Sequence, residues 1–189
     1  MEVRKRKPRA DALKNRELLL AAARDVLGQG GPEASLEAVA RQAGVGIGTL
    51  YRHFPTREDL FNAVFSRELE DLVRMVEGQQ EAPDPVAAVR DWLHANVAVV
   101  ETKRGMLGAL SVVMTEESKQ SYAELSKRLT VAVDHLLQRG MAEGRIRQGV
   151  TSEDLMQTMY ALCYARPAGP DWRPRVLRLL DIFLDGLEC

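Results

Sequence analysis

The segment from residue 36 to residue 65, LEAVARQAGVGIGTLYRHFPTREDLFNAVF, constrains the fold more than any other part of the chain. It predicts two short helices joined by a glycine turn and followed by a longer helix. Ser35 is a favourable N-cap for the first helix, and Gly44 stands where a helix end prefers a left-handed residue. Val45 in the turn is expected to pack inward. Pro55 ends the second helix, because proline lacks the N–H that would continue it.

The second short helix, at about residues 47–54, has an inner and an outer face when its residues are placed about 100° apart on a wheel. Leu50 and Phe54 fall together and are expected to face the core, with Ile47 close to them. The outer face offers polar groups that can contact phosphates, and an arginine can also read guanine edges. Geometry alone leaves an ordinary corner of an all-helical protein as the alternative. The outer positions are Gly48, Thr49 and Arg52, with Tyr51 and His53 on the flanks.

The run from residue 35 to residue 61 resembles the DNA-binding domain of the TetR family of bacterial repressors. The turn AGV, the helix GTLYRHF and the helix start TREDL stand at the family's spacing, and the similarity extends over roughly residues 15–66. The C-terminal part is similar to the SbtR-like branch. The resemblance implies a sequence-specific transcriptional regulator that is released from a palindromic operator by a small-molecule effector. It also implies that the residues in contact with double-stranded DNA are Ser35, Gly48, Thr49, Tyr51, Arg52, His53 and Arg57.

The charge of the chain is divided unevenly along its length. Residues 1–57 hold 11 Lys/Arg and 6 Asp/Glu, whereas residues 58–189 hold 15 and 21, so the two parts carry +5 and −6. A basic head on an acidic body is the asymmetry expected of a modular DNA-binding protein. We therefore expect a DNA-binding domain over 1–57 and a ligand-binding and dimerisation domain over 58–189, coupled by the helix at 56–78.

The remaining sequence predicts an all-α fold of about nine helices without a convincing strand. The head comprises a basic arm and a three-helix helix-turn-helix domain, and the body is a helical bundle. The resemblance implies that the last two helices form a homodimer interface with two-fold symmetry; closing the body's own core is the alternative. The expected helices cover about residues 11–29, 36–43, 47–54, 56–78, 85–101, 105–114, 118–143, 152–164 and 172–187.

Methionines and aromatic residues in the body are candidates for an adaptable apolar ligand pocket. Most of them could equally be core residues at helical spacing, and the sequence does not identify the effector beyond a preference for an apolar or aromatic one. The candidates are Trp92, Met106, Met114, Tyr122, Met156, Met159, Tyr160 and Tyr164. The basic arm at residues 4–9 is expected to contact DNA phosphates or to remain a solvated tail.

Other classes of function have little support in the sequence. No GxSxG, HExxH, P-loop or GxGxxG motif occurs, so we expect no enzyme, no cofactor and no metal. Asp91 and His94 share a helix face, but a solvated polar pair is the expected reading. The two cysteines form no disulfide framework, no membrane span or secretory signal is apparent, and a cytoplasmic location is expected. An activator, a ligand-independent regulator or a helical ligand-binding protein without DNA binding remain as alternatives.

Overall fold

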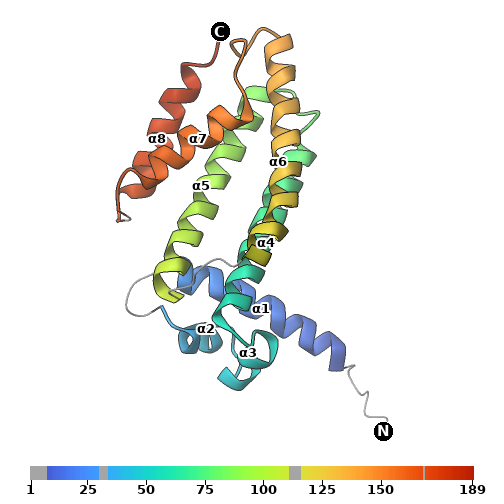
Figure 1. Cartoon of the computed structure of the whole chain (residues 1–189), viewed down its shortest axis with the longest axis vertical. Coiled ribbons are helices and arrows are strands. Elements are labelled where there is room, and N and C mark those ends of the chain that lie inside the picture. The colour runs from blue at the N-terminus through green and yellow to red at the C-terminus, as the bar shows by residue number, and fades with distance from the viewer. Residues whose placement is uncertain (1–7, 30–33, 111–115, 168) are drawn as a thin grey trace. The chain divides into compact units, whose positions relative to one another are not determined.

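The computed structural model describes residues 8–29, 34–110, 116–167 and 169–189, and their secondary structure is helical (Figure 1). An isolated antiparallel bridge joins Ile146 to Glu188, and the described residues form no strand longer than this. The helices are α1 (Pro8–Gly28), α2 (Leu36–Gln42), α3 (Ile47–His53), α4 (Arg57–Gly78), α5 (Pro85–Leu110), α6 (Glu116–Ala142), α7 (Ser152–Tyr164) and α8 (Trp172–Asp185). None of them has the length and hydropathy needed to cross a bilayer.

The expected all-α fold is confirmed, with eight helices in place of about nine. The difference lies in α5, which continues through residues 102–104, where a break between two helices was predicted. Gly105 directly follows that stretch, but a single glycine costs a helix only about 1 kcal/mol. The predicted end of the first helix at about residue 29 agrees with α1, which ends at Gly28, whereas the predicted helix end at Met114 lies outside the described residues.

Polar side chains fix where α5 and α7 begin. The Asp84 carboxylate accepts hydrogen bonds from the backbone N–H groups of Val86 and Ala87, at 2.9 and 3.0 Å. The Arg145 guanidinium also binds Asp84 and holds the pKa of its carboxyl below the ordinary value. At α7, Thr151 and Asp154 form a capping box, in which each side chain accepts from the other's backbone N–H.

Packing divides the chain into two compact units. The first unit comprises the described residues of 1–66 and 101–115, which hold α1, α2, α3, the start of α4 and the end of α5. In it α1 packs on α2 and α2 on α3. The predicted boundary at residue 57 separates a DNA-binding from a ligand-binding domain. It concerns function rather than packing and stays a prediction. The buried core of this unit includes Leu19, Ala23, Leu27, Leu36, Val39, Ala40, Leu50, Phe54, Leu60, Phe61 and Val64.

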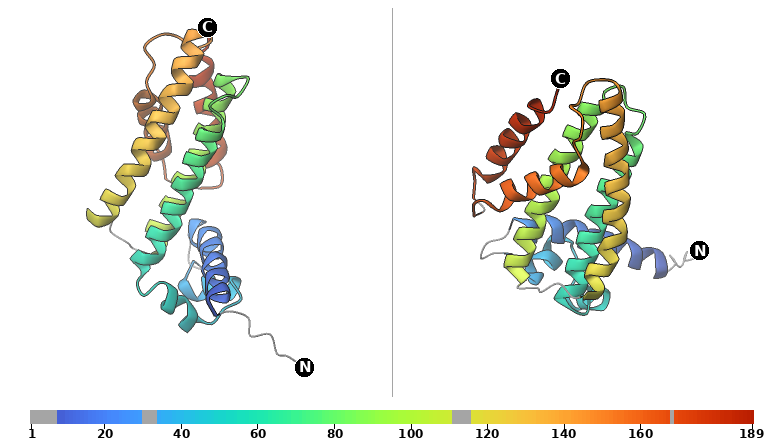
Figure 2. Two further views of the ribbon diagram at one scale, coloured as in Figure 1. Left: turned by 90° about the vertical axis from the view of Figure 1, so that its right-hand side faces the viewer. Right: turned by 45° about the horizontal axis from the view of Figure 1, so that its top comes forward.

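The second unit comprises the described residues of 67–100 and 116–189. In it α5 runs antiparallel to both α4 and α6, while α6 packs on α7 and α7 on α8 (Figures 1 and 2). Arg90 of α5 binds α8 through Asp181 at 2.9 Å and Asp185 at 2.7 Å, and also binds Glu188. The buried core of this unit includes Val86, Val89, Trp92, Leu93, Val97, Leu129, Val133, Leu136, Leu155, Met159, Cys163, Val176, Leu180 and Leu184.

Two glycines allow a close approach of α1 and α5 inside the first unit. A Cβ added at Gly105 would lie 1.9 Å from the carbonyl oxygen of Gly28, so no side chain fits there. A Cβ at Gly28 would contact Thr102 at 3.4 Å. The end of α5 therefore lies directly against the end of α1, which braces the helix-turn-helix.

We predict that Gly105→Ala destabilises the protein by about 1–3 kcal/mol, the usual cost of forcing an extra carbon into a packed contact. Gly108→Ala is the matched control, because a Cβ there meets nothing within 4 Å and alanine favours the helix by up to about 1 kcal/mol. Urea unfolding of the two variants measures both effects. Equal changes in the free energy of unfolding would show that the Gly28 contact does not constrain the head.

Candidate nucleic-acid interface

The turn between α2 and α3 is fixed by backbone hydrogen bonds. The N–H of Gly44 donates to Arg41 at 3.2 Å and the N–H of Val45 donates to Ala40 at 3.0 Å, which is the Schellman pattern of a helix end. Gly44 has φ of +69°, a conformation that glycine adopts without the steric cost of a side chain. The Ser35 hydroxyl caps the other end of α2 by accepting from the Ala38 N–H at 3.1 Å. The sequence therefore sets both ends of α2, and with them the direction in which α3 starts.

The inner face of α3 is buried as the sequence predicted. Leu50 and Phe54 have almost no exposed surface, and the Arg16 guanidinium of α1 lies 5.4 Å from the centre of the Phe54 ring. Burial of Leu50 fixes how α3 is rotated about its own axis. The opposite face of the helix must then point outward.

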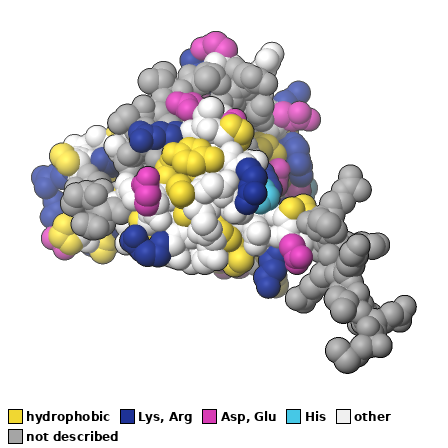
Figure 3. All heavy atoms as spheres, turned by 90° about the horizontal axis from the view of Figure 1, so that it is seen from below, with side chains coloured by type: hydrophobic (Ala, Val, Ile, Leu, Met, Phe, Trp, Pro, Cys, Tyr) yellow, Lys and Arg dark blue, Asp and Glu magenta, His cyan; other side chains and the backbone are white. Residues whose placement is uncertain are grey.

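The outer face of α3 carries the predicted side chains. Gly48, Tyr51 and Arg52 are exposed, whereas Thr49 and His53 are half-buried. A Cβ added at Gly48 would meet nothing within 4 Å, so this face is open at the helix backbone. Figure 3 looks onto the end of the molecule where α2 and α3 lie, and basic side chains, a histidine and an apolar patch share that surface. These positions form one contiguous polar surface on a short helix.

Arg52 has a defined position on this face. Its Nη2 donates a hydrogen bond to the Thr49 hydroxyl at 2.7 Å, one turn earlier in α3. The bond draws the guanidinium along the helix surface and restricts its rotamers. Sequence reasoning placed both residues on one face but did not predict that they bind each other.

Ile47 is a surface residue that sequence reasoning assigned to the core side. Its side chain is 38% exposed at the first position of α3, because Gly46 before it is the N-cap and the helix has not yet turned inward. Exposed apolar side chains beside polar ones can pack against thymine methyl groups. The wheel places Ile47 only about 60° from Leu50, so the helix pattern alone does not indicate its exposure.

The start of α4 is also well defined. The Thr56 hydroxyl accepts from the Asp59 N–H at 3.1 Å, and the Asp59 carboxylate accepts from the Thr56 N–H at 3.1 Å. This capping box follows the sharp stop at Pro55 and places Arg57, the first residue of α4, at the exposed end of the helix. Arg57 is therefore positioned by the fold at the same end of the first unit as the turn that follows α3.

The eight candidate ligand residues are not brought together as one group. Trp92, Tyr122 and Met159 are buried in the second unit and Met156 is half-buried there, whereas Met106 is buried in the first unit. Tyr160 and Tyr164 are exposed on α7. Met114 lies outside the described residues, as do residues 4–7 of the basic arm predicted at 4–9, whereas Pro8 and Arg9 belong to the first turn of α1.

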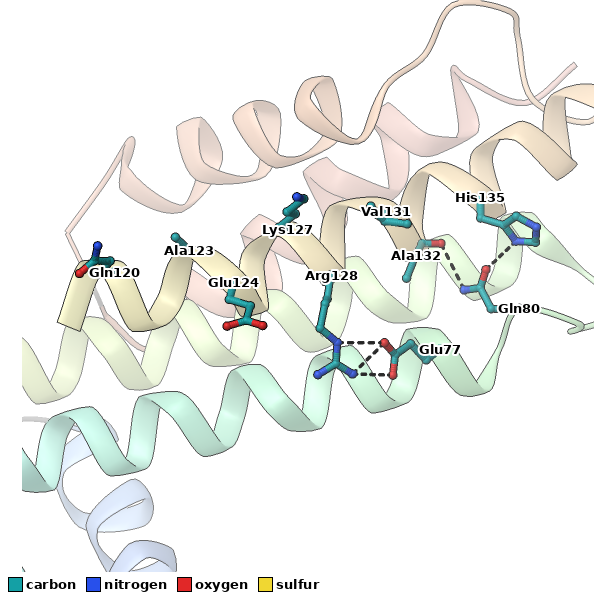
Figure 4. A pocket seen from close by; sticks show the side chains of 10 residues that line it. All are labelled: Glu77, Gln80, Gln120, Ala123, Glu124, Lys127, Arg128, Val131, Ala132 and His135. Atoms are coloured by element: carbon teal, nitrogen blue, oxygen red, sulfur yellow. Dashed lines mark hydrogen bonds and ion pairs between the residues drawn. The ribbon is translucent and has the colours of Figure 1, made fainter. Parts of the chain in front are cut away.

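An open groove of about 940 Å³ runs along α4 and α6, and none of the candidate ligand residues lines it (Figure 4). Arg128 binds Glu77 at 2.8 Å across it, and His135 binds Gln80, whose amide also donates to the Ala132 carbonyl. Four of the polar side chains of the groove thus bind one another or the helix backbone. Its lining is Glu77, Gln80, Gln120, Ala123, Glu124, Lys127, Arg128, Val131, Ala132 and His135.

Several titratable side chains of the body have structural partners. His94 Nε2 lies 2.8 Å from Asp181, so it belongs to the Arg90 cluster between α5 and α8. Asp181 is partly desolvated, but its bonds to Arg90 and His94 lower the pKa of its carboxyl overall. Within the described residues, no three His, Cys, Asp or Glu side chains lie close enough to hold a metal ion. Cys163 is buried and Cys189 exposed, and neither is in a disulfide.

Known proteins share both parts of the chain. A sequence profile described as bacterial regulatory proteins of the tetR family matches residues 19–64, and a profile of the C-terminal domain of SbtR-like transcriptional regulators matches residues 84–189. A TetR transcriptional regulator from Streptomyces coelicolor has a crystal structure that aligns with a TM-score of 0.73 and 34% identity, over 92% of this chain and 98% of that one.

Curated relatives match shorter stretches. An HTH-type transcriptional regulator of Staphylococcus aureus is 34% identical over 79 residues, which are 41% of each chain. The fatty acid metabolism regulator protein of Bacillus subtilis is 27% identical over 144 residues, about 70% of each chain. The profiles and relatives are transcriptional regulators, which are not enzymes.

The second profile covers more than half of the chain, and the S. coelicolor alignment covers nearly all of it. The first profile and the S. coelicolor alignment agree with the helix-turn-helix geometry of α2 and α3. Together with the second profile they confirm the predicted resemblance, including its SbtR-like C-terminal part. The chain belongs to the TetR family of DNA-binding bacterial transcriptional regulators.

Proposed function

We propose that the protein is a homodimeric repressor that binds a two-fold symmetric DNA operator through α3 and leaves it when a small molecule binds the body. The observation that carries the DNA-binding part is the outer face of α3, where exposed polar groups stand opposite a fully buried Leu50. A short helix fixed in this way fits the major groove. A regulator of this kind acts where bacterial DNA is, in the cytoplasm.

Each side chain of the face has a role in this proposal. Tyr51, His53 and the backbone at Gly48 approach the sugar-phosphate chain, which positions the helix without reading sequence. Arg57 and the start of α2 at Ser35 hold phosphates on either side. Arg52, supported by Thr49, reaches a guanine edge, and Ile47 lies against a thymine methyl group.

Affinity for DNA should respond to these residues in two distinct ways. Tyr51→Phe and Arg57→Ala each remove a phosphate contact of about 1 kcal/mol, so binding to every sequence should weaken roughly 5-fold. Arg52→Ala should in addition lower the preference for the operator over a one-base variant, by about 1–3 kcal/mol at the position that it reads. A mobility-shift titration with DNA from upstream of the protein's own coding sequence measures both quantities.

Arg74→Ala is the matched control, because Arg74 is an exposed arginine of α4 that pairs with Asp71 in the second unit. It should leave both quantities unchanged. If all three α3 and α4 variants bind like Arg74→Ala, the outer face of α3 is not the DNA-binding surface.

Dimerisation through α7 and α8 is supported by their exposed apolar side chains. Tyr160 and Tyr164 lie one turn apart on α7, and Leu179 and Ile182 lie at i and i+3 on α8. Ile182 is 57% exposed although it is a large apolar residue. Such paired stripes are what a second copy would cover in an isologous four-helix contact, which holds two α3 helices at a fixed spacing.

We predict that Ile182→Glu converts the dimer to monomer, because it places an unpaired charge in an apolar interface. Val131→Glu is the control: Val131 is 63% exposed on α6, outside these stripes, and its variant should remain dimeric. Sedimentation velocity at micromolar protein distinguishes the two. A dimer that survives Ile182→Glu and dissociates with Val131→Glu would place the interface on α6.

Ligand control is the third part of the proposal. The buried Trp92, Tyr122 and Met159 are supported as pocket residues by their position in the core of the second unit, with Met156 at its edge. Tyr160 and Tyr164 fit the dimer stripe better. Release of DNA requires only that the ligand bind the DNA-incompetent state more tightly. An activator or a ligand-independent regulator would use the same α3 face, and addition of candidate effectors to the mobility shift separates them.

A further inference from the structure

Two polar side chains of α5 are buried in the second unit without adequate hydrogen-bond partners. Trp92 and Asn96 are 1% and 2% exposed, one turn apart on α5. The indole N–H of Trp92 has no acceptor. The Asn96 amide donates to the thioether sulfur of Met156 at 3.2 Å, and a thioether is a weak acceptor.

This arrangement is unusual because buried donors in folded proteins nearly always find oxygen acceptors. The chain itself provides the comparison: the other indole, that of Trp172, is also buried and donates to the Cys163 carbonyl at 3.0 Å. Leaving the Trp92 donor unpaired lowers stability without any gain in the folded protein alone. The buried Trp92 N–H is therefore a donor available to an acceptor from outside the chain.

The surroundings show what kind of acceptor fits. Residues at i and i+4 share a helix face, so Trp92 and Asn96 point to the same side of α5, with about 6 Å of helix rise between them. Arg90 and His94 lie on a different side of the helix, where they bind Asp181. The Lys103 ammonium lies over the ring of Phe65 in the first unit.

Movement of the Met156 side chain can open a path for a ligand to the two donors. Its side chain is only half-buried and has three rotatable bonds, so it can leave Asn96 when a better acceptor arrives. Apart from Asn96 and Ser152, the buried side chains of this unit, Met159 among them, are hydrophobic. The two donors on α5 thus face an apolar region that one flexible side chain borders.

We infer that Trp92 and Asn96 form the polar end of the effector site, which takes an apolar molecule with a neutral acceptor oxygen such as a ketone, ester or amide. Both donors are neutral, and a carboxylate buried against them without a cation would carry a large desolvation cost. This inference rests on the proposed binding of an effector in the body. It names the chemical class of that effector.

The test uses three probes of similar size on the full protein without DNA: acetophenone, ethylbenzene and benzoate. The chain has two tryptophans, and Trp172→Phe assigns the remaining indole N–H signal in a ¹H–¹⁵N NMR spectrum to Trp92. Acetophenone should move the Trp92 proton downfield, as a new hydrogen bond does. Ethylbenzene should bind at least 5-fold more weakly without the downfield shift, and benzoate at least 10-fold more weakly.

Asn96→Leu is the decisive variant because leucine has a similar size and no donor. It should lose the preference for acetophenone over ethylbenzene, while its midpoint of urea unfolding stays equal to or above that of the wild type. A purely structural amide would instead lower the midpoint and leave the probe preference intact. Trp92→Phe should lose the same preference.

Either of two results would overturn the inference. One is a chemical shift of the Trp92 indole proton that does not change with acetophenone at its solubility limit. The other is a Trp92 indole proton that already exchanges magnetisation with a buried water. The proposed function fails separately. If the protein dimerises and binds DNA in the mobility-shift assay but does not bind acetophenone, only this inference is wrong. If it binds acetophenone but no DNA, the proposed function is wrong.

Discussion

The burial of Leu50 and Phe54 is the contact on which the DNA-facing surface depends. A helix of seven residues is not stable alone in water, so α3 exists because its inner side packs in the core of the first unit. That packing also fixes the rotation of α3, and therefore which side chains point outward. The glycine turn before α3, the capping box after it and the glycine contact between α1 and α5 all hold this one short helix in place.

Much of the fold could be predicted from the sequence because its signals are local. Caps at Ser35 and Thr151, the left-handed Gly44 and the apolar periodicity give the helices and most of their ends. The continuity of α5 was not predicted, since two helices were expected with a gap at residues 102–104. The glycine at position 105 has a tertiary cause, because the carbonyl of Gly28, far away in sequence, leaves no room for a side chain there. A pattern within one helix carries no information about such a contact.

The candidate interface was predictable for the same reason, since one short helix carries most of it. The wheel separated Leu50 from Arg52 correctly, yet it misplaced Ile47, whose exposure depends on where the helix starts. The ligand residues were far less predictable. Composition selected aromatic and methionine side chains but could not separate buried Trp92 from exposed Tyr164, nor indicate that Asn96 lies in the core. Those distinctions depend on which helices pack together.

The measurement that tests the central claim most directly is selection of DNA from a random-sequence pool with the full-length protein, followed by sequencing. The account predicts enrichment of a two-fold symmetric motif whose half-sites lie about one helical turn, 10–10.5 base pairs, or a multiple of it apart. The selected DNA should bind in competition with unrelated DNA and more weakly as salt increases. A pool that shows no enriched motif after repeated rounds would contradict the claim that α3 reads DNA sequence.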